Sequence, residues 1–497
     1  LQYWAERTPD APAFICSGQP DISYGALWRQ VNALAEALNR CGVALRDRVV
    51  LLLPEGPALA VALLGTASAA IAIPLNASLT TPELSRALEE LDASAALAMP
   101  TLSGVMSACL TQCGISVFEL RIGDGSQPPT VACKRGRAAV RNERPQPPDI
   151  AIVNQTSGTT GKPKRVPRRH GILMNSGRSH RDQYGLDRRD RGLLAAPITL
   201  TLGTSTLSQS IVAGSALILP PLSDVARFWE TLLAEGPTWM QASAGFLELL
   251  ARFVRSNPSL PPPTSLRFVR VTAAAITPAV CDELANYLSA PVLPSYSSSE
   301  AGRISMALPP PATTKPGSVG KPVQEVKIVG AGDAAAGAGI DGEIWVRGPR
   351  VFAGYLDDPA TNATVLMPDG WFRTGDTGYL DHDGFLYITG RVNELINRGG
   401  DKIAPVEVDE VLLSHPAVQA AAAFAVPDER LGEDIVAAVV LAKGQTVSPR
   451  ELRCWMLDRL AVPKVPRRIW FVDTLPMTAT GKAQRVELTR LWLEKQR

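Results

Sequence analysis

The sequence predicts an α/β protein with a large N-terminal part of several subdomains, in which mixed sheets are packed by helices, followed by a small α+β C-terminal domain. Three observations favour this fold class. Helix-like and strand-like segments alternate along the first part of the chain, which is typical of α/β layers. The pattern changes after Arg391, where a separate set of helices and strands begins. A chain of 497 residues also exceeds one compact domain, and its 45% hydrophobic content is enough for real cores.

Hydrophobic periodicity gives the first elements. Residues 27–38 have the pattern of a helix, and residues 48–54 form an apolar run typical of a buried strand. Residues 80–91 begin with a Thr-Pro helix start and place Leu84 and Leu88 on one face. These segments predict successive helices and strands of one layered unit.

Residues 58–74 are nearly free of polar side chains. Gly65 and Ser68 interrupt the run, and Pro74 closes it after about 16 residues, which is short for a bilayer. We expect a buried helix that runs into a buried strand, and no membrane span.

The later elements are separated by connectors. A basic, proline-rich stretch from Lys134 leads into an apolar strand at residues 149–155, and the chain becomes β-rich from residue 342. Ser448, Pro449 and Glu451 form a capping box at the start of a helix near the C-terminus. The C-terminal domain is predicted to contain helices at residues 405–415 and 448–457 and strands at residues 418–427 and 434–444.

Composition excludes several classes of protein. The net charge is +2 and no long basic run is present, so a nucleic-acid partner is not expected. The seven cysteines are scattered, and only Cys109 and Cys113 lie close together, at a poor spacing for zinc. We expect reduced thiols and a cytoplasmic location. The four histidines have no obvious Ser or Cys partner, which argues against a His-based hydrolase.

The stretch TSGTTGKPK, from Thr156 to Lys164, combines two glycines, four hydroxyl side chains and two lysines. Glycines let backbone N–H groups approach an anion, hydroxyls add donors and lysines add charge. The stretch therefore predicts a phosphate-binding loop after a strand, with a plain polar turn as the alternative. It is not a Walker A loop, because Gly158 and Gly161 are separated by two residues and Pro163 replaces the required hydroxyl residue.

This stretch resembles the phosphate-binding signature of the adenylate-forming superfamily, which includes acyl-CoA synthetases, adenylation domains of peptide synthetases and luciferases. Other family signatures follow in order: SYSSSEAG from Ser295, GSVGKP from Gly317, WFRTGD ending at Asp376, GRVNELINRGGDK from Gly390 and PMTATGKAQR from Pro476. The INRGGDK segment looks closest to oxalate–CoA and aryl-acid ligases. The resemblance covers most of the chain.

The resemblance implies a division into residues 1–390, which bind ATP and the acid, a hinge at residues 391–394, and a mobile C-terminal domain at residues 395–497. It also implies roles for single residues. Lys482 would bridge the carboxylate and the α-phosphate in the first step, whereas a lone exposed lysine would be the default without the motif. Asp376 would accept hydrogen bonds from the ribose hydroxyls, with a surface turn acid as the alternative.

The remaining implied roles complete the site. Tyr296 would lie against adenine, Arg391 would assist at the ribose or phosphate, and Glu300 would hold Mg²⁺, since a hard cation prefers carboxylate oxygens. The implied catalytic residues are Lys482, Glu300 and Lys164. The implied nucleotide-binding residues are Thr156, Ser157, Gly158, Thr159, Thr160, Gly161, Lys162, Lys164, Ala274, Tyr296, Ser299, Asp376 and Arg391.

In the second step, a pantetheine thiol would attack the acyl-adenylate after the C-terminal domain rotates. The hinge position is Asn393, where family members usually have Asp or Lys, and Asn tolerates unusual backbone angles. Gly399 and Gly400 would border the thiol tunnel, with a simple turn as the alternative. The family's aromatic or His gate is missing, because Leu200 stands in the corresponding segment.

The substrate pocket is expected to include Thr199, Leu200, Gly203 and Arg303. No acidic residue occurs from residue 195 to residue 222, where amino-acid-activating members carry an Asp for the ammonium group. A buried ammonium group without a partner is costly, so an α-amino acid is disfavoured. Arg303 would read a second polar or acidic group of the acid, or form a salt bridge elsewhere.

The resemblance therefore implies an acid–thiol ligase that uses ATP and Mg²⁺ to convert a small carboxylic acid into acyl-AMP and then a thioester. The acceptor is CoA or the phosphopantetheine arm of an acyl carrier protein. The balance leans slightly to the carrier, as in a loading domain of polyketide or nonribosomal peptide biosynthesis. The alternative is a catalytically silent nucleotide-binding scaffold of the same fold.

Overall fold

The structure is a computed structural model. It describes residues 1–77, 79–101, 104–121, 129–133, 144–156, 164–273, 276–330, 332, 334–399, 401–478 and 482–496. The described strands form four sheets of nine, seven, four and five strands. Both large sheets are mixed α/β sheets of the predicted N-terminal part, and the five-stranded sheet lies wholly after residue 395.

The two large sheets have mainly parallel strands. The nine-stranded sheet has the order β16-β15-β14-β13-β12-β10-β11-β1-β2, and the seven-stranded sheet has the order β7-β6-β5-β3-β4-β8-β9. The strands of the first are β1 (Pro12–Cys16), β2 (Ile22–Ser23), β10 (Arg191–Ala195), β11 (Ala216–Leu219), β12 (Trp239–Ser243), β13 (Phe268–Thr272), β14 (Val292–Ser298), β15 (Gly302–Met306) and β16 (Lys321–Pro322). Those of the second are β3 (Arg48–Leu52), β4 (Ile71–Pro74), β5 (Ala95–Ala98), β6 (Ser116–Arg121), β7 (Thr130–Cys133), β8 (Ile150–Thr156) and β9 (Lys164–Arg169).

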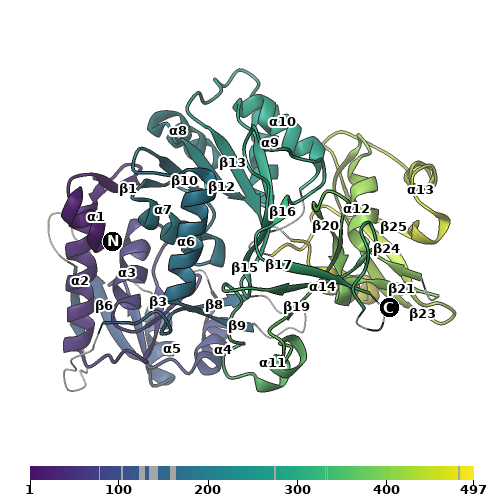
Figure 1. Ribbon diagram of the computed structural model, residues 1–497. Helices are drawn as coiled ribbons and strands as arrows, with labels where there is room; N and C mark the ends of the chain where they lie inside the picture. The colour runs from purple at the N-terminus through teal and green to yellow at the C-terminus, as the bar shows by residue number, and fades with distance from the viewer. Residues whose placement is uncertain are drawn as a thin grey trace.

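Helices cover both faces of each large sheet. Side chains alternate along a strand, so Val49 and Leu51 of β3 enter a core shared by both sheets, whereas Val50 enters a core on the outer face. Figure 1 shows these layers side by side. Between the sheets lie α2 (Tyr24–Arg40), α3 (Pro57–Ala67) and α7 (Thr201–Ala213); outside lie α4 (Thr81–Leu91) and α5 (Gly104–Gln112) on one side, and α8 (Val225–Glu235), α9 (Ala244–Ser256) and α10 (Pro278–Leu288) on the other.

The sequence-based elements of this part are found in the structure. The apolar stretch at residues 58–74 folds as α3 followed by β4, both almost fully buried. None of the helices in the described part of the chain is long and apolar enough to cross a membrane. The helix start at residue 80 carries a full capping box, in which the Thr80 backbone N–H donates to Glu83 Oε2 at 2.8 Å.

The remaining N-terminal elements include an antiparallel sheet of β17 (Glu325–Val329), β18 (Gly342–Arg347), β19 (Phe372–Leu380) and β20 (Leu386–Arg391). It packs against Val166 of β9 and Ala301, so it is joined to both large sheets. The other helices of this part are α1 (Gln2–Arg7), α6 (His170–Tyr184) and α11 (Pro359–Val365).

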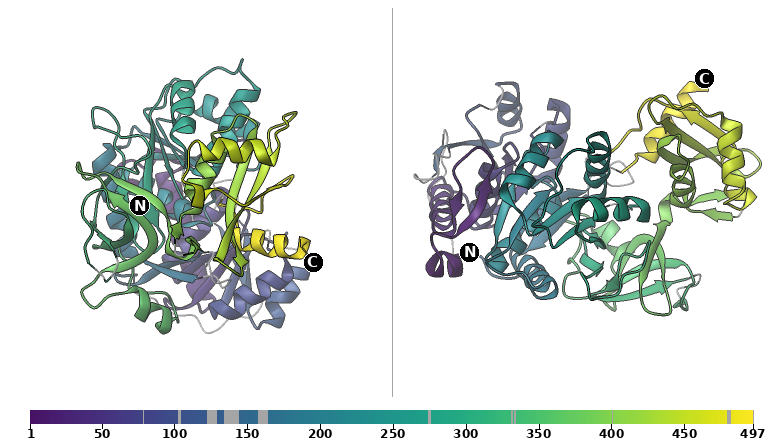
Figure 2. Two further views of the ribbon diagram at one scale, coloured as in Figure 1. Left: turned by 90° about the vertical axis from the view of Figure 1, so that its right-hand side faces the viewer. Right: turned by 90° about the horizontal axis from the view of Figure 1, so that it is seen from above.

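The C-terminal unit follows a short 3₁₀ turn, η2 (Val392–Glu394). Its helices α12 (Pro405–Leu413) and α13 (Pro449–Leu457) cover one face of the sheet, and α14 (Arg485–Lys495) packs on the other. Figure 1 places it at the end of the molecule opposite α1, and Figure 2 shows it beside the green four-stranded sheet. Its strands are β21 (Ile396–Arg398), β22 (Asp401–Ile403), β23 (Val418–Asp428), β24 (Gly432–Leu441) and β25 (Arg468–Phe471).

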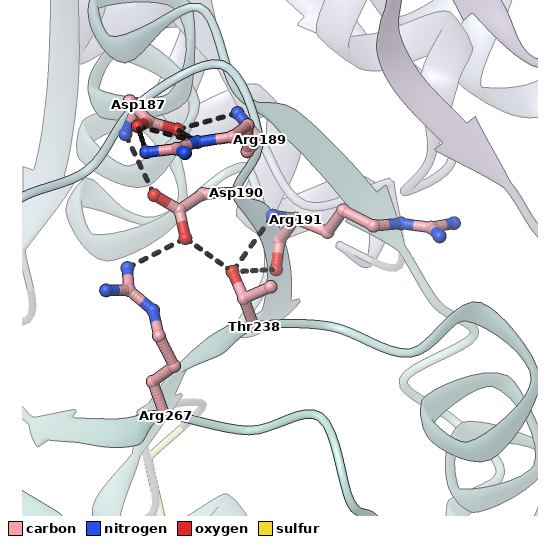
Figure 3. Close-up of polar contacts among 6 residues, drawn as sticks. All are labelled: Asp187, Arg189, Asp190, Arg191, Thr238 and Arg267. Carbon is pink, nitrogen blue, oxygen red and sulfur yellow. Dashed lines mark hydrogen bonds and ion pairs between the residues drawn. The ribbon is translucent and has the colours of Figure 1, made fainter.

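A polar cluster joins the starts of three parallel strands of the nine-stranded sheet. Asp190, before β10, accepts hydrogen bonds from the Thr238 hydroxyl before β12 and from Arg267 before β13, each at 2.7 Å. Its other oxygen accepts from the Asp187 backbone N–H at 2.8 Å. Figure 3 shows the three donors converging on this one carboxylate, which is 6% exposed. The cluster therefore links the amino ends of these parallel strands, at the end of the sheet opposite their carboxyl ends.

The cysteines are only partly as predicted. Those with free side chains are Cys16, Cys109, Cys113, Cys281 and Cys454. Cys41 is disulfide-bonded, so the prediction of reduced thiols is wrong at this position. No sequence pattern indicated this bond, because cysteine spacing does not reveal which side chains the fold brings together.

Candidate active site

A cleft of about 1830 Å³ runs between the carboxyl ends of β13 and β14, the four-stranded sheet and the C-terminal unit. Ligands of open α/β sheets bind at such strand ends. The lining includes five of the residues predicted from the motifs: Tyr296, Glu300, Asp376, Arg391 and Lys482. They come from three strands, β14, β19 and β20, and from two connecting segments, so the fold brings distant motifs together.

Asp376 and Arg391 stand directly opposite each other on β19 and β20. The Asp376 carboxylate accepts a hydrogen bond from the Tyr296 hydroxyl at 2.5 Å and pairs with Arg391 Nε at 3.0 Å. Burial, together with this carboxylate, raises the pKa of Tyr296 well above its usual value, so the phenol stays protonated. Asp376 is only 7% exposed, so its carboxylate is a fixed hydrogen-bond acceptor. This excludes the alternative that Asp376 is an acid in a surface turn.

Glu300 follows β14 and accepts a hydrogen bond from the Tyr355 hydroxyl at 2.8 Å. Burial and the Glu300 charge both raise the pKa of Tyr355. Lys164 lies over the Tyr355 ring at 4.8 Å, so its charge stands close to Glu300. Tyr355 is therefore a positioning residue that the sequence motifs did not reveal.

Lys482 reaches the cleft from the C-terminal unit. Although its side chain is open to solvent, the surrounding protein lowers its pKa, and the Arg391 charge lowers it further. Asp376, Glu394 and Glu300 act in the opposite direction. A lysine whose charge is tuned by these residues differs from an ordinary solvated lysine.

The strand ends next to these residues are tied by hydroxyl groups. The Ser299 hydroxyl lies 2.7 Å from that of Thr201, and the Thr272 hydroxyl lies 3.0 Å from that of Ser297. Ala273 adopts a left-handed φ of 81° at the end of β13. Backbone strain of this kind occurs at binding sites, where the surroundings hold it in place.

The phosphate-binding stretch is described only at its ends. Thr156 of β8 pairs in register with Lys164 of β9, so the loop joins two antiparallel strands whose ends border the cleft. Several predicted site residues lie outside the described residues: Ser157, Gly158, Thr159, Thr160, Gly161, Lys162, Ala274 and Gly400.

Only some of the residues predicted for the substrate pocket line the cleft. Leu200 and Arg303 line it. Thr199 instead bonds to Glu55, which accepts from its hydroxyl at 2.9 Å and from the Ile198 backbone N–H at 2.7 Å. Gly203 has a packing role, because a Cβ there would lie 2.1 Å from the Pro197 carbonyl oxygen. Glu55 thus supplies a carboxylate next to residues 198–199, a part of the chain that has no acidic residue of its own. This carboxylate already accepts hydrogen bonds from backbone and hydroxyl donors.

Of the predicted hinge and tunnel residues, Asn393 borders the cleft and Gly399 does not. Asn393 is exposed in η2, between β20 and β21, and lines the cleft. Gly399 has a φ of +62° in the turn after β21, a conformation that glycine adopts without strain. Its N–H donates to the Leu431 carbonyl at 2.9 Å. The described part of the cleft lining does not include Gly399.

Sequence reasoning missed a group of buried basic residues. Arg168 and His180 line the cleft, and Arg270 lies next to it within β13. A signal was present, because Arg270 interrupts the apolar run FVRVT and Arg168 lies within a strand. A charged residue in a buried strand requires a specific reason.

Comparison with known proteins agrees with this arrangement. Residues 1–356 match the AMP-binding enzyme family, and residues 407–482 match the AMP-binding enzyme C-terminal domain. The chain is 34% identical to oxalate–CoA ligase of Arabidopsis thaliana, over 100% of this chain and 98% of that protein. It is 35% identical to a probable CoA ligase of Humulus lupulus, over 98% and 94% of the two chains.

A solved structure is similar along the whole chain. O-succinylbenzoate coenzyme A synthetase of Bacillus subtilis, in complex with ATP and magnesium ion, superposes with a TM-score of 0.85 at 28% identity, covering 98% of each chain. These relatives are acid–CoA ligases, so the chain is an acid–thiol ligase that activates a carboxylic acid with ATP, and a silent scaffold is not supported. The chain belongs to the family of AMP-binding enzymes.

Proposed function

We propose that this ligase activates a small carboxylic acid other than an α-amino acid, and transfers the acyl group from acyl-AMP to free CoA. One observation carries the proposal. Lys482 of the C-terminal unit shares a cleft with Asp376 and Glu300 of the N-terminal part, and their charges affect its pKa. Cations and fixed acceptors that converge in one cleft are what an adenylation step requires.

In the first step, a carboxylate oxygen of the acid attacks the α-phosphorus of ATP, and the bond to pyrophosphate breaks. Asp376 holds the ribose hydroxyls, Tyr296 lies against the adenine, and Arg391 assists at the ribose or phosphate. The loop from Thr156 to Lys164 holds the β- and γ-phosphates. Lys482 offsets the charge repulsion between the carboxylate and the α-phosphate.

Glu300 is the proposed protein ligand of Mg²⁺. Among the described residues there is no group of three His, Cys, Asp or Glu side chains that could hold a metal ion. A magnesium ion would therefore take its remaining ligands from the phosphates and water, as this ion commonly does. When bound, the ion would neutralise phosphate charge, and Tyr355 would keep the Glu300 carboxylate in position.

In the second step, the thiol sulfur attacks the acyl carbon, the bond to AMP breaks, and the thiol proton passes to solvent. We place the hinge at residues 391–394, between an N-terminal domain of residues 1–390 and a mobile domain of residues 395–497. The exposed position of Asn393 in a short turn supports this placement. Rotation would bring Gly399 and Gly400 to the thiol path.

The proposed acceptor is CoA, although the sequence alone leaned to a carrier protein. The relatives named above are a probable CoA ligase, an oxalate–CoA ligase and an O-succinylbenzoate coenzyme A synthetase. The absence of an acid between residues 195 and 222 supports exclusion of α-amino acids, since Glu55 is already engaged by that segment.

Acid-dependent pyrophosphate release tests the proposal. A panel of short acyl, dicarboxylic, aryl, alicyclic and α-amino acids would be offered with ATP, and then CoA or a carrier protein would be added at equal thiol concentration. We expect pyrophosphate release with a non-amino acid and thioester formation with CoA. A carrier at least tenfold better than CoA, a difference of about 1.4 kcal/mol in barrier, would overturn the acceptor. Release of inorganic phosphate alone would contradict the reaction itself.

A further inference from the structure

Four arginines in or behind the cleft wall are buried without an ion pair to a described carboxylate. Arg168, Arg270, Arg303 and Arg350 are 2%, 0%, 5% and 7% exposed. Arginine is almost never so buried unless it is paired. Within the described part of the chain, none of the four forms an ion pair with a carboxylate. The Glu300 charge raises the pKa of Arg168 without an ion pair, whereas no described carboxylate acts in this way on Arg270, Arg303 or Arg350.

The partners that two of these arginines do have are neutral. Arg350 donates to the Ser179 hydroxyl at 2.9 Å and to the Val323 carbonyl at 2.6 Å. Arg270 donates to Gln209 Oε1 at 2.8 Å and lies over the Trp239 ring at 4.6 Å. Arg270 and Arg350 are therefore held in place, but they remain uncompensated charges behind the cleft wall.

Arg303 and Arg168 differ, because they line the cleft itself. Nε and Nη1 of Arg303, and all three side-chain nitrogens of Arg168, are buried and have no hydrogen-bond acceptor among the described residues. A buried donor without an acceptor is costly, and a planar guanidinium is suited to bind an oxyanion through two parallel hydrogen bonds. The unused donors therefore point to a ligand.

The positive charges around Arg303 repel one another and lower the pKa values of their neighbours. Burial lowers the pKa of Arg270 to about 9, and the nearby Arg303 charge contributes to this shift. Burial also lowers the pKa of His180 well below its usual value, as do the charges of Arg303, Arg270 and Arg350. His180 Nδ1–H donates to the Ser176 carbonyl at 2.8 Å, so the neutral ring presents Nε2 as an acceptor, and no donor among the described residues reaches it. A bound anion would relieve this mutual repulsion.

The position of Arg303 relates this cationic cluster to the reacting end of the acid. Arg303 lies on β15, opposite Ser297 of β14, and Glu300 is only three residues before it. Leu200 and Thr201, from the start of α7, line the same cleft. A small acid can therefore place one end at Lys482 and Glu300 and the other at the arginines.

We infer that the acid carries a second oxyanion group, a carboxylate or a sulfonate, which is bound by Arg303. This inference rests on the proposed function and specifies the substrate class of the same site. Arg303 is then a specificity-determining residue, and the substrate supplies the counter-charge that the protein lacks.

Matched pairs of acids test the inference on the full chain. Each pair has the same carbon number, such as propionate against malonate and butyrate against succinate, and sulfoacetate is added as the sulfonate arm. The measured quantity is kcat/KM for acid-dependent pyrophosphate release. We expect an anionic end group to be preferred at least about 100-fold in the best-fitting pair, equivalent to about 2.7 kcal/mol.

The variant Arg303→Met keeps most of the side-chain volume and removes the charge. It should reduce the preference to below about tenfold, and it should abolish the thermal stabilisation that the preferred acid gives to the wild-type protein. Arg350→Met is the matched control, since Arg350 is equally buried but does not belong to the described cleft lining. It should lower the melting temperature and leave the preference ratio unchanged.

Arg303→Lys serves if the methionine variant does not fold. A lysine keeps the charge but loses the bidentate geometry, so the preference should fall by about tenfold. Equal use of mono- and dianionic acids by the wild-type protein, or an unchanged preference in both Arg303 variants, would sink the inference. In that case pyrophosphate release would still support the proposed function, whereas failure of every acid would overturn the proposed function itself.

Discussion

The carboxylate of Asp376 lies 3.0 Å from Nε of Arg391, and the two residues face each other across the β19–β20 pair. The 16 residues from Asp376 to Arg391 form a hairpin of two strands and a turn, which brings the motif that ends at Asp376 next to the motif that contains Arg391. Because β20 leads directly into η2, the same pair also stands at the entry to the proposed hinge.

Replacing Asp376 by Ala should raise the apparent KM for ATP at least about tenfold. Two hydrogen bonds to a charged acceptor contribute about 3–6 kcal/mol at most. Asp376→Asn keeps the shape and one acceptor, and should give a smaller increase. The measurement is ATP dependence of pyrophosphate release at saturating acid, and an unchanged dependence in the Ala variant would remove Asp376 from the nucleotide site.

Lys482→Ala should slow acyl-adenylate formation by about 10²-fold or more, because a positive charge at the reacting phosphate is lost. The variant should still convert supplied acyl-adenylate into thioester. Lys464→Ala is a suitable control, since Lys464 pairs with Glu407 in the same C-terminal unit at 2.6 Å. Rapid-mixing measurements of the two half-reactions separate the effects. An equal loss in both half-reactions would contradict a role confined to the first.

The rate of the first step should fall on the alkaline side below pH 10.5, the ordinary pKa of lysine. The surrounding protein and the Arg391 charge lower the pKa of Lys482, so the required charge is lost as pH rises through the lowered value. The profile of kcat/KM for ATP reports the free enzyme. Glu394 raises this pKa, so Glu394→Gln should move the alkaline limb to lower pH. A shift in the other direction would show that a different group controls this limb.

Asp190→Ala should destabilise the N-terminal part without changing the active site. Its carboxylate accepts from Thr238, Arg267 and the Asp187 backbone, so the variant leaves these donors unpaired at a cost of about 2–4 kcal/mol. The melting temperature should fall by about 4–10 °C. Asp187→Ala is the control, because its side chain is 44% exposed and its ion pair with Arg189 contributes little. Calorimetry measures both, and similar shifts in the two variants would contradict the role given to Asp190.

Local rules were sufficient for elements whose signals lie within a few residues. The capping boxes at Thr80 and Ser448 mark the starts of α4 and α13, because each requires only residues three positions apart. The apolar stretch at residues 58–74 was correctly assigned as buried helix and strand, since its length excluded a bilayer span. Motif order predicted one site for Asp376, Glu300 and Lys482, and the three residues line one cleft.

Contacts between distant residues could not be predicted in this way. The hydrogen bond from Tyr355 to Glu300 joins residues 55 positions apart, and that from Ile198 to Glu55 joins residues 143 positions apart. Their geometry depends on how the sheets pack, which no local pattern encodes. The same holds for Arg168 and Arg270, whose positions within strands were visible but whose lack of acidic partners required the assembled fold.

Arg485 of α14 pairs with Glu394 of η2 at 3.2 Å and with Asp409 of α12 at 2.7 Å. It stands three residues after Lys482, so this network ties the segment that carries Lys482 to the turn that precedes the C-terminal sheet. Recombination between related ligases is therefore constrained. A crossover between residues 394 and 395 would take Glu394 from one parent and Arg485 from the other, whereas a crossover just before Arg391 would inherit the whole network from a single parent.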